Sequence, residues 1–121
     1  MERKYNRGEM YFAHLDDGIG SEQKGRRPVV IIQNDIGNAH SPTLIVASIT
    51  SEIYGKSQLP THCFLKADYG LQKDSFILLE QIRTIDKRRL REHMGHLSDT
   101  QMSLVDNAIA VSFGLNGANV Q

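Results

Sequence analysis

The chain has 121 residues, which is enough for one domain, since single hydrophobic cores are built from about 100–200 residues. Hydrophobic residues make up 40% and charged residues 23%, a composition that is typical of globular proteins and argues against disorder. The 14 Lys and Arg balance the 14 Asp and Glu, which argues against a protein held on nucleic acid by overall basicity. The single cysteine, Cys63, excludes a disulfide scaffold and a multi-cysteine zinc site.

Two features of the apolar residues predict where the protein works. No apolar run follows the charge-rich residues 1–7, so we expect no signal peptide. The longest apolar runs, Val29–Ile32 and Phe76–Leu79, are too short to span a bilayer, which needs about 20 residues. We therefore expect a cytoplasmic protein without a membrane partner, folded as a single domain over residues 1–121.

In chain order, short apolar runs rich in β-branched residues alternate with Gly, Pro, Asn and Asp, a pattern that predicts a mainly-β domain. The expected strands are Glu9–Leu15, Val29–Gln33, Thr43–Ser51, Thr61–Lys66 and Ser75–Ile85. Polar segments separate them as two long loops and a turn, expected over Asp16–Arg27, Glu52–Pro60 and Asn34–Asn38. Pro28 opens the second strand, where no ladder donor is needed. Alternation in the last strand sets four residues on one face: Leu79, Gln81, Arg83 and Ile85.

The last predicted element is a helix. Ser98 is a good N-cap, Gln101 completes a capping box, and Gly114 ends the helix. It carries two apolar stripes, one of Met102, Val105 and Ile109 and one of Leu104, Ala108, Val111 and Leu115. Two stripes are more than one small sheet buries easily, which favours a dimer. Five or six strands and one helix predict a compact, strongly bent β-barrel, SH3-like in its class, with the C-terminal α-helix packed on the sheet.

Few motifs carry chemistry. His93 and His96 would share a face if their segment were helical, but no further ligand follows at metal-site spacing, so we expect no metal and no cofactor. Cys63 lies within an alternating strand and is interpreted as a buried structural thiol. The segment 87–91 holds four basic residues, for which a solvated face is the simpler interpretation. Arg27 differs, because it stands where a loop meets a buried strand and its guanidinium suits bidentate phosphate recognition.

At this point several ordered blocks of sequence resemble a known family. They are 7–13, the segment 20–35 that contains Gly-Ser-Glu-Gln and Arg-Pro, the strand 41–50, and the later run Glu-Gln-Ile-Arg-Thr-Ile-Asp at 80–86. Over a core of about residues 6–115 the chain resembles the MazF/PemK toxins of bacterial type II toxin–antitoxin systems, in the form common in Gram-positive bacteria.

The resemblance implies a PemK-like fold and a sequence-specific, metal-independent endoribonuclease acting on single-stranded mRNA. It also implies a homodimer and a cognate antitoxin whose disordered C-terminal segment blocks the RNA groove. In such toxins an Arg at the position of Arg27 and a Thr at the position of Thr50 carry catalysis. The implied RNA-binding residues are Ser21, Glu22, Gln23, Ser51 and Gln81.

Our mechanistic hypothesis is that the ribose 2′-OH attacks the adjacent phosphorus. Arg27 would stabilise the phosphorane and Thr50 would donate to a phosphate oxygen, while Glu22 is the one nearby carboxylate we nominate as general base. The rival hypothesis is a non-catalytic binding module of nucleic acid or protein, such as a toxin of the same fold that poisons a topoisomerase, because fold alone does not fix function.

Overall fold

The protein is described by a computed structural model that covers residues 3–52 and 59–115. Its elements are β1 (Glu9–Leu15), β2 (Gly25–Ile31), α1 (Asp35–His40), β3 (Thr43–Thr50), β4 (His62–Leu65), β5 (Ser75–Asp86), the short 3₁₀ turn η1 (Lys87–Arg89), β6 (Leu90–His96) and α2 (Asp99–Phe113). Most of the expected loop Glu52–Pro60 lies outside the described residues.

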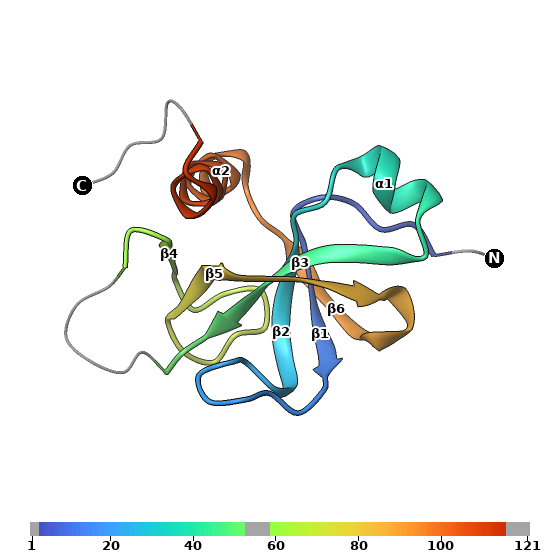
Figure 1. Cartoon of the computed structure of the whole chain (residues 1–121), viewed down its shortest axis with the longest axis horizontal. Coiled ribbons are helices and arrows are strands. Elements are labelled where there is room, and N and C mark those ends of the chain that lie inside the picture. Colours follow the sequence, from blue (N-terminus) through green and yellow to red (C-terminus); the bar gives the residue numbers. More distant parts are fainter. Residues whose placement is uncertain (1–2, 53–58, 116–121) are drawn as a thin grey trace.

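The strands form one antiparallel sheet in the order β4-β5-β3-β2-β1-β6. The sheet is strongly bent, so that β1 and β2 cross β3 and β5 steeply in Figure 1. Helix α2 packs against β4 and β5. The prediction of a mainly-β fold with a C-terminal helix on the sheet is therefore confirmed.

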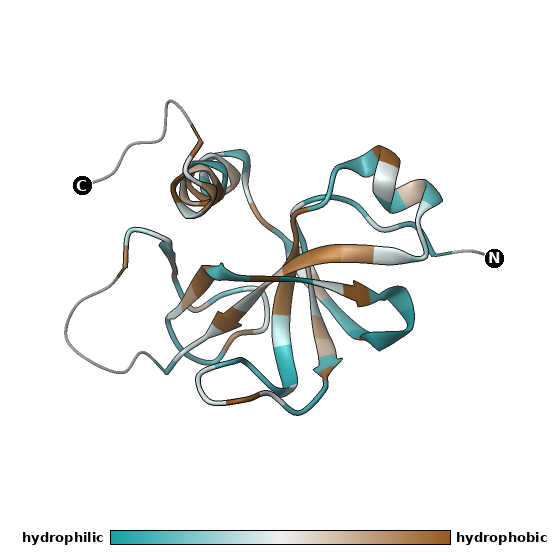
Figure 2. Cartoon of the chain, in the orientation of Figure 1, coloured by the Kyte–Doolittle hydropathy of each residue, from teal (hydrophilic) through white to brown (hydrophobic). Residues whose placement is uncertain are grey.

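Buried side chains lie on both faces of this sheet. Met10 and Val30 belong to the cluster that includes α2, whereas their neighbours Tyr11 and Val29 belong to a cluster on the other face. The two-residue period of a strand produces this division. Figure 2 shows the result, with hydrophobic residues gathered in the strands and hydrophilic ones in much of the β1–β2 loop. Packing on both faces of the sheet therefore holds the ends of the strands in place.

Strand β2 begins earlier than the sequence predicts. The expected loop Asp16–Arg27 ends at Lys24, because Gly25 already pairs with Leu15 of β1. Arg27 is thus a strand residue, and Pro28 lies inside the strand rather than at its start. The β2–β3 ladder begins only at Val29, so on that side Pro28 lies where no N–H donor is required.

The expected turn Asn34–Asn38 is a short helix instead. Asn34 caps α1, and its side-chain oxygen accepts a hydrogen bond from the Gly37 N–H at 2.8 Å. The buried Asn38 side chain donates to the Gln33 carbonyl at 2.9 Å. These side-chain bonds satisfy polar groups at the helix start, and turn-forming residues thereby nucleate one helical segment.

Strand β6 was not predicted. Of its residues only Leu90 is buried, so the sequence shows no apolar alternation. The segment is held by pairing with β1, in which Tyr11 lies opposite His93. The helical arrangement considered for the two histidines is therefore wrong. His93 contacts Glu9 at 2.9 Å, and His96 contacts the Leu97 carbonyl at 2.7 Å.

A bulge interrupts the alternation expected in β5. Ala47 pairs with Ile82, but the next residue of β3, Ser48, pairs with Leu78. The intervening β5 residues have no partner in register, so the two halves of the strand are out of phase. Leu79 packs in the cluster with α2 and Ile85 in the opposite cluster, which corrects the expectation that they share a face.

Helix α2 begins and ends as predicted. The Ser98 hydroxyl accepts from the Gln101 N–H at 3.1 Å, and Gly114 ends the helix in the left-handed conformation. The capping box is only half formed, because the Gln101 side chain donates to the Phe64 carbonyl instead. Leu104 of the second stripe is 55% exposed. Within residues 3–52 and 59–115, no helix is long and apolar enough to cross a membrane.

Candidate functional site

Strands β2 and β3 bring Arg27 and Thr50 to one place. Val29 pairs with Ser48, and continuing this antiparallel register by two residues sets Arg27 opposite Thr50. Both residues line a hollow of about 540 Å³, which we call the Arg27 hollow. They also line a smaller hollow of about 280 Å³. The two residues that the sequence reasoning singles out are thus neighbours on one surface.

The Arg27 guanidinium is held at its base and open at its tip. Nε donates to the Lys24 carbonyl at 3.0 Å, which fixes the side chain against the end of the β1–β2 loop. Within the described parts of the chain, the two terminal nitrogens have no hydrogen-bond partner. A half-buried guanidinium that keeps two parallel donors unused is suited to a phosphate, which accepts both.

The Thr50 hydroxyl lies at the end of β3 in a nearly buried residue, 4% exposed. Its oxygen accepts from the Glu52 N–H at 3.1 Å. Its own proton points to the Glu52 carbonyl over 3.5 Å, which is too long for a strong bond. The backbone therefore fixes the oxygen while the proton remains available to another acceptor.

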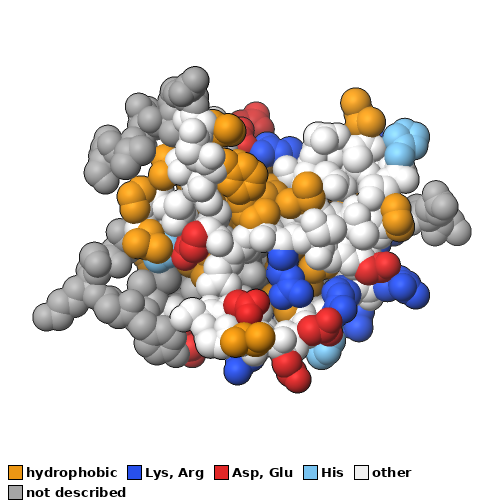
Figure 3. All heavy atoms as spheres, in the orientation of Figure 1, with side chains coloured by type: hydrophobic (Ala, Val, Ile, Leu, Met, Phe, Trp, Pro, Cys, Tyr) orange, Lys and Arg blue, Asp and Glu red, His pale blue; other side chains and the backbone are white. Residues whose placement is uncertain are grey.

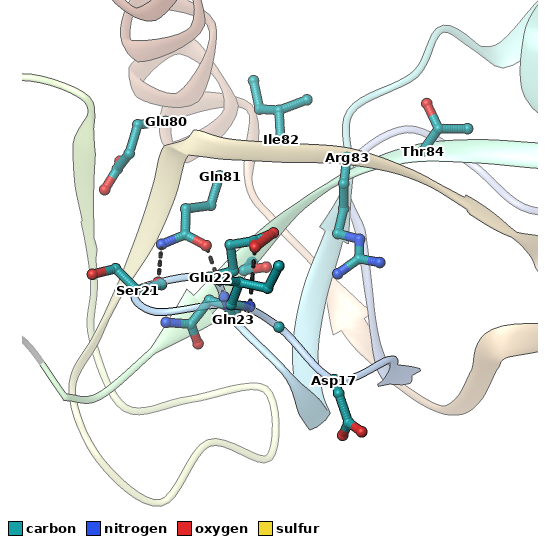
Figure 4. Close-up of a pocket in the computed structure, with 12 residues that line it drawn as sticks. Asp17, Ser21, Glu22, Gln23, Glu80, Gln81, Ile82, Arg83 and Thr84 are labelled. Carbon is teal, nitrogen blue, oxygen red and sulfur yellow. Dashed lines mark hydrogen bonds between the residues drawn. The ribbon is translucent and has the colours of Figure 1, made fainter.

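The β1–β2 loop forms one wall of the Arg27 hollow and is bound to β5. Gln81 accepts from the Gln23 N–H at 2.9 Å and donates to the Ser21 carbonyl at 2.9 Å. Figure 4 shows this amide lying between strand and loop. The loop is therefore an ordered wall, and four of the five expected RNA-binding residues belong to it or to its anchor.

Glu22 stabilises the same loop. Its Oε1 accepts from the Ile19 N–H at 3.0 Å, and its own N–H donates to the Ile19 carbonyl at 3.2 Å. The carboxylate lines the Arg27 hollow together with Arg27 and Thr50. Among the described residues only one of its oxygens accepts a hydrogen bond, and a carboxylate at this position has the chemistry required of a proton acceptor.

Comparison with known proteins decides the family. A family model described as PemK-like, MazF-like toxin of type II toxin-antitoxin system matches residues 6–113. The chain belongs to this family. The resemblance inferred from the sequence blocks is thereby confirmed.

Individual relatives agree with the MazF/PemK assignment. The chain is 56% identical over 110 residues to Endoribonuclease EndoA of Bacillus subtilis strain 168, covering 90% of this chain and 94% of EndoA. The Mycobacterium tuberculosis toxin MazF-mt6 is 27% identical with a TM-score of 0.75, over 89% of this chain and 98% of that one. A mycobacterial endoribonuclease solved in complex with its cognate antitoxin is 21% identical with a TM-score of 0.71, over 92% and 96%, and it supports the fold alone.

Ser51 lies beside the other expected site residues of this MazF-like chain, but in a different hollow. It lines the 280 Å³ hollow on the far side of the Arg27–Thr50 pair, next to Lys73 and Ser75. Ser21, Glu22, Gln23 and Gln81 line the Arg27 hollow. All seven candidate site residues thus lie along one surface, which we call the groove.

Sequence reasoning missed two polar residues of the groove, His62 and Glu80. The His62 Nδ1 accepts from the Leu59 N–H at 3.2 Å, so Nε2 carries the proton and donates to Glu80 Oε2 at 2.9 Å. Glu80 also accepts from the Thr61 hydroxyl at 2.9 Å. Glu80 precedes Gln81 in the Glu-Gln-Ile-Arg-Thr-Ile-Asp run at 80–86, so the sequence offered a signal for it. His62 is brought to Glu80 only by the β4–β5 pairing.

The basic residues beyond Arg27 mostly contact the protein itself. Arg26 pairs with Glu92 and stacks over the Phe12 ring at 4.1 Å. In the 87–91 segment, Lys87 donates to the Asn38 carbonyl at 2.6 Å, and Arg89 donates twice to Asp16 at 2.7 Å. Lys87 and Arg89 therefore bind other parts of the same chain and serve its structure.

Cys63 is buried, as predicted. Burial raises the pKa of its thiol, and the hydrogen bond from Gln101 opposes this shift less strongly. The thiol is therefore protonated near neutral pH and is a poor nucleophile. In the described part of the chain no three His, Cys, Asp or Glu side chains are gathered as a metal ion would require.

Proposed function

We propose that this chain is a sequence-specific endoribonuclease toxin that cleaves single-stranded RNA without a metal ion. The enzyme class is supported by 56% identity to EndoA over nearly its whole length. The observation that carries the chemistry is the meeting of an open guanidinium fork, on Arg27, with the Thr50 hydroxyl in one hollow. The RNA supplies its own nucleophile, so the reaction requires neither an activated water nor a metal.

The proposed step is an internal transfer at phosphorus. The 2′-oxygen loses its proton and attacks the adjacent phosphorus, while the bond to the 5′-oxygen breaks and that oxygen takes up a proton. The products are a 2′,3′-cyclic phosphate and a 5′-OH end. Arg27 stabilises the dianionic phosphorane with its two terminal nitrogens, and Thr50 donates to a phosphate oxygen.

Proton transfer is assigned to Glu22 and Arg27 as a pair. Glu22 is the carboxylate of the loop that faces the same hollow, and we nominate it as general base. Arg27 is a poor base because a guanidinium is protonated at every physiological pH, so any proton it transfers goes to the leaving oxygen.

Specificity is proposed to come from base edges read by Ser21, Gln23, Ser51 and Gln81. Single-stranded RNA is recognised when splayed bases form hydrogen bonds along their edges. Amides and hydroxyls offer both donors and acceptors for such contacts. The ordered loop wall supports this role, because preformed partners lose little entropy on binding.

The proposed partners are a cognate antitoxin and a second copy of the chain. An acidic, partly apolar C-terminal segment of an antitoxin would lie along the groove, its carboxylates on Arg27 and its apolar residues on Ile19 and Leu59, which are 83% and 50% exposed at the rim. A homodimer is supported by the exposed Leu104 on α2. A messenger RNA substrate implies that the protein acts in the cytoplasm.

The proposal is tested by sequencing the ends of RNA cut in EDTA. Wild-type protein is expected to give 5′-OH and cyclic phosphate ends at a defined short sequence. Arg27→Ala and Thr50→Ala are each expected to reduce the rate by about 10²–10³, the usual cost of removing one preorganised donor. A deoxyribose at the cleaved position is expected to abolish cleavage at that position.

Three results would contradict the proposal. One is wild-type-like cleavage by both variants, and another is cutting at the deoxyribose position. The third is intact RNA that is nonetheless bound, which would instead favour the non-catalytic module. Circular dichroism melts of the variants separate lost chemistry from lost folding.

A further inference from the structure

The groove continues beyond the Arg27 hollow into a third hollow of about 730 Å³, which we call the Arg83 hollow. The two hollows are contiguous, since they share five lining residues: Ser21, Glu22, Gln23, Glu80 and Gln81. The added part is lined by the regularly paired β5 residues that follow the bulge and by the start of the β1–β2 loop. An RNA strand that lay along both hollows would therefore pass Arg83.

Arg83 faces this path. In Figure 4 its side chain hangs from β5 toward the loop, on the same side as Gln81, whereas Ile82 and Thr84 point the other way. This orientation is the ordinary alternation of a strand, because Arg83 lies two residues after Gln81 and pairs in register with Val46 of β3.

The Arg83 guanidinium is left without an ionic partner. It forms no hydrogen bond and no ion pair with any residue of 3–52 or 59–115. Other arginines differ, because a carboxylate binds Arg7, Arg26, Arg88 and Arg89. A guanidinium is charged at every physiological pH, so an unpaired one on a groove wall is a site for an anion.

The carboxylates near this hollow are committed elsewhere. Glu80 is held by Thr61 and His62, and Glu22 accepts from the Ile19 N–H. Asp17 points away from β5 in Figure 4. Asp16, just before it, is bound by Arg89. Asp16 lies near enough for the Arg83 charge to add, after Arg89, to the lowering of the Asp16 pKa, but in the described chain none of these carboxylates forms an ion pair with Arg83.

A buried hydroxyl lies beneath the hollow. Ser48 lies on the floor, and its Oγ is fully buried without a hydrogen-bond partner in the described chain. The bulge in β5 begins opposite this residue.

The sheet register gives the distance from the reacting centre. Arg83 pairs with Val46, which precedes Thr50 by four residues on the same strand. At the rise of an extended strand this separation is about 13 Å. An extended single strand covers that length in a few nucleotides, so Arg83 lies beside a flanking linkage and not beside the scissile one.

We propose that Arg83 is a further RNA-binding residue, which holds a backbone phosphate a few nucleotides from the scissile linkage. The inference rests on the proposed function, because it assumes that RNA lies in the groove. The guanidinium binds two oxygens of the phosphate and so fixes the register of the strand over the Arg27 hollow. It contributes to binding and takes no part in the bond-breaking step.

The test combines a protein variant with a neutralised linkage. A synthetic RNA that carries the cleaved sequence is prepared with one uncharged methylphosphonate at each flanking linkage in turn. With wild-type protein, one such linkage is expected to raise KM by about 10-fold or more, the usual loss for a charged hydrogen bond. With Arg83→Gln, KM is raised for the normal RNA and the same methylphosphonate adds no further loss, while kcat changes less than about twofold.

The matched control is Arg91→Gln, an exposed arginine on β6 that lines none of the groove hollows described above. It is expected to keep the wild-type KM and the wild-type sensitivity to the neutral linkage. The plot of log K against log salt has a negative slope. Arg83→Gln is also expected to make this slope less steep by about 0.7, the value for one phosphate on a single strand.

Four results would overturn the inference. They are a KM for Arg83→Gln equal to that of the control, a methylphosphonate penalty that survives in the variant, a fall in kcat alone, or a changed base preference with an unchanged salt slope. If the variant does not fold, the series of methylphosphonate RNAs still tests the inference with wild-type protein. A KM that is the same for every RNA of the series would exclude a contact with a flanking phosphate. Absence of cleavage by wild-type protein would instead reject the proposed function.

Discussion

At the scale of the residue, the surroundings of a side chain decide its role more than its type. Arg89 and Arg27 both lie in basic clusters of the sequence. Arg89 meets Asp16 and becomes a structural ion pair, whereas Arg27 is held through Nε and keeps its terminal nitrogens open. The same chemistry thus serves structure in one place and a proposed reaction in the other. Charge alone does not reveal which.

Glu22 allows a test of this distinction at one residue. Glu22→Gln keeps an oxygen that accepts from the Ile19 N–H, so the loop is expected to stay ordered. The amide cannot take a proton, so kcat is expected to fall by about 10²–10⁴, the usual contribution of a general base. The measurement is single-turnover cleavage at saturating protein.

Glu22→Ala is the companion variant, since it removes both the base and the loop contact. It is expected to lose kcat as the glutamine variant does and to raise KM in addition. A glutamine variant with wild-type kcat would show that Glu22 only orders the loop and that the base is another group.

At the scale of the element, the β1–β2 loop is anchored at both ends. Gln81 binds its later part, and Arg89 clamps Asp16 at its start through two bonds of 2.7 Å. Arg89 also donates to the His14 carbonyl at 3.2 Å. The 3₁₀ turn between β5 and β6 therefore supports a wall of the groove from a distance.

Arg89→Gln is expected to loosen this wall and raise KM several-fold, with a small loss of thermal stability because exposed ion pairs contribute little. The hydrogen bonds from Arg89 hold the pKa of Asp16 below its ordinary 3.8. A folded-state pKa below the unfolded one means that the pair stabilises above 3.8, and that this stability is lost as pH falls through the lowered pKa. The difference in melting temperature between wild type and variant should therefore disappear in acid.

Arg88→Gln is the matched control. Arg88 lies in the same turn and lowers the pKa of Asp86 in the same way, but it does not reach the loop. It should alter the acid dependence of stability and leave KM unchanged. Equal KM values for the two variants would argue against a clamp.

At the scale of the whole molecule, balanced charge limits indiscriminate binding. The net charge is zero, and Figure 3 shows Lys and Arg side chains interspersed with Asp and Glu on the visible face. Several arginines form ion pairs with carboxylates. The cations that line the groove and can bind RNA are then Lys24, Arg27 and Arg83. Affinity for RNA without the target sequence is therefore expected to be weak.

Salt dependence measures this directly. For a single-stranded RNA that lacks the target sequence, three groove cations predict a slope of log K against log salt of about −2, at about 0.7 per phosphate. Fluorescence anisotropy over a salt series gives the slope. A slope steeper than about −5 would show that basic residues outside the groove, those of segment 87–91 above all, also bind RNA.

Local patterns allowed much of the fold to be predicted from the sequence. Strand β1 has the expected bounds, β3 and β4 differ by one or two residues, and Ser98 and Gly114 delimit α2 as expected. These features depend on alternation and capping, which act between residues close in the chain. Strand β6 and helix α1 escaped prediction because pairing with β1 holds the first and side-chain caps nucleate the second.

The sequence by itself determined the family, the strand-rich class and the residue types that the reaction needs, because each is written in short contiguous blocks. Only the tertiary structure decided which of these residues meet. The β2–β3 register brings Arg27 to Thr50, the β4–β5 pairing brings His62 to Glu80, and the β3–β5 register sets Arg83 on the side that faces the loop. Such contacts join residues far apart in the chain, and they exist only once the sheet has formed.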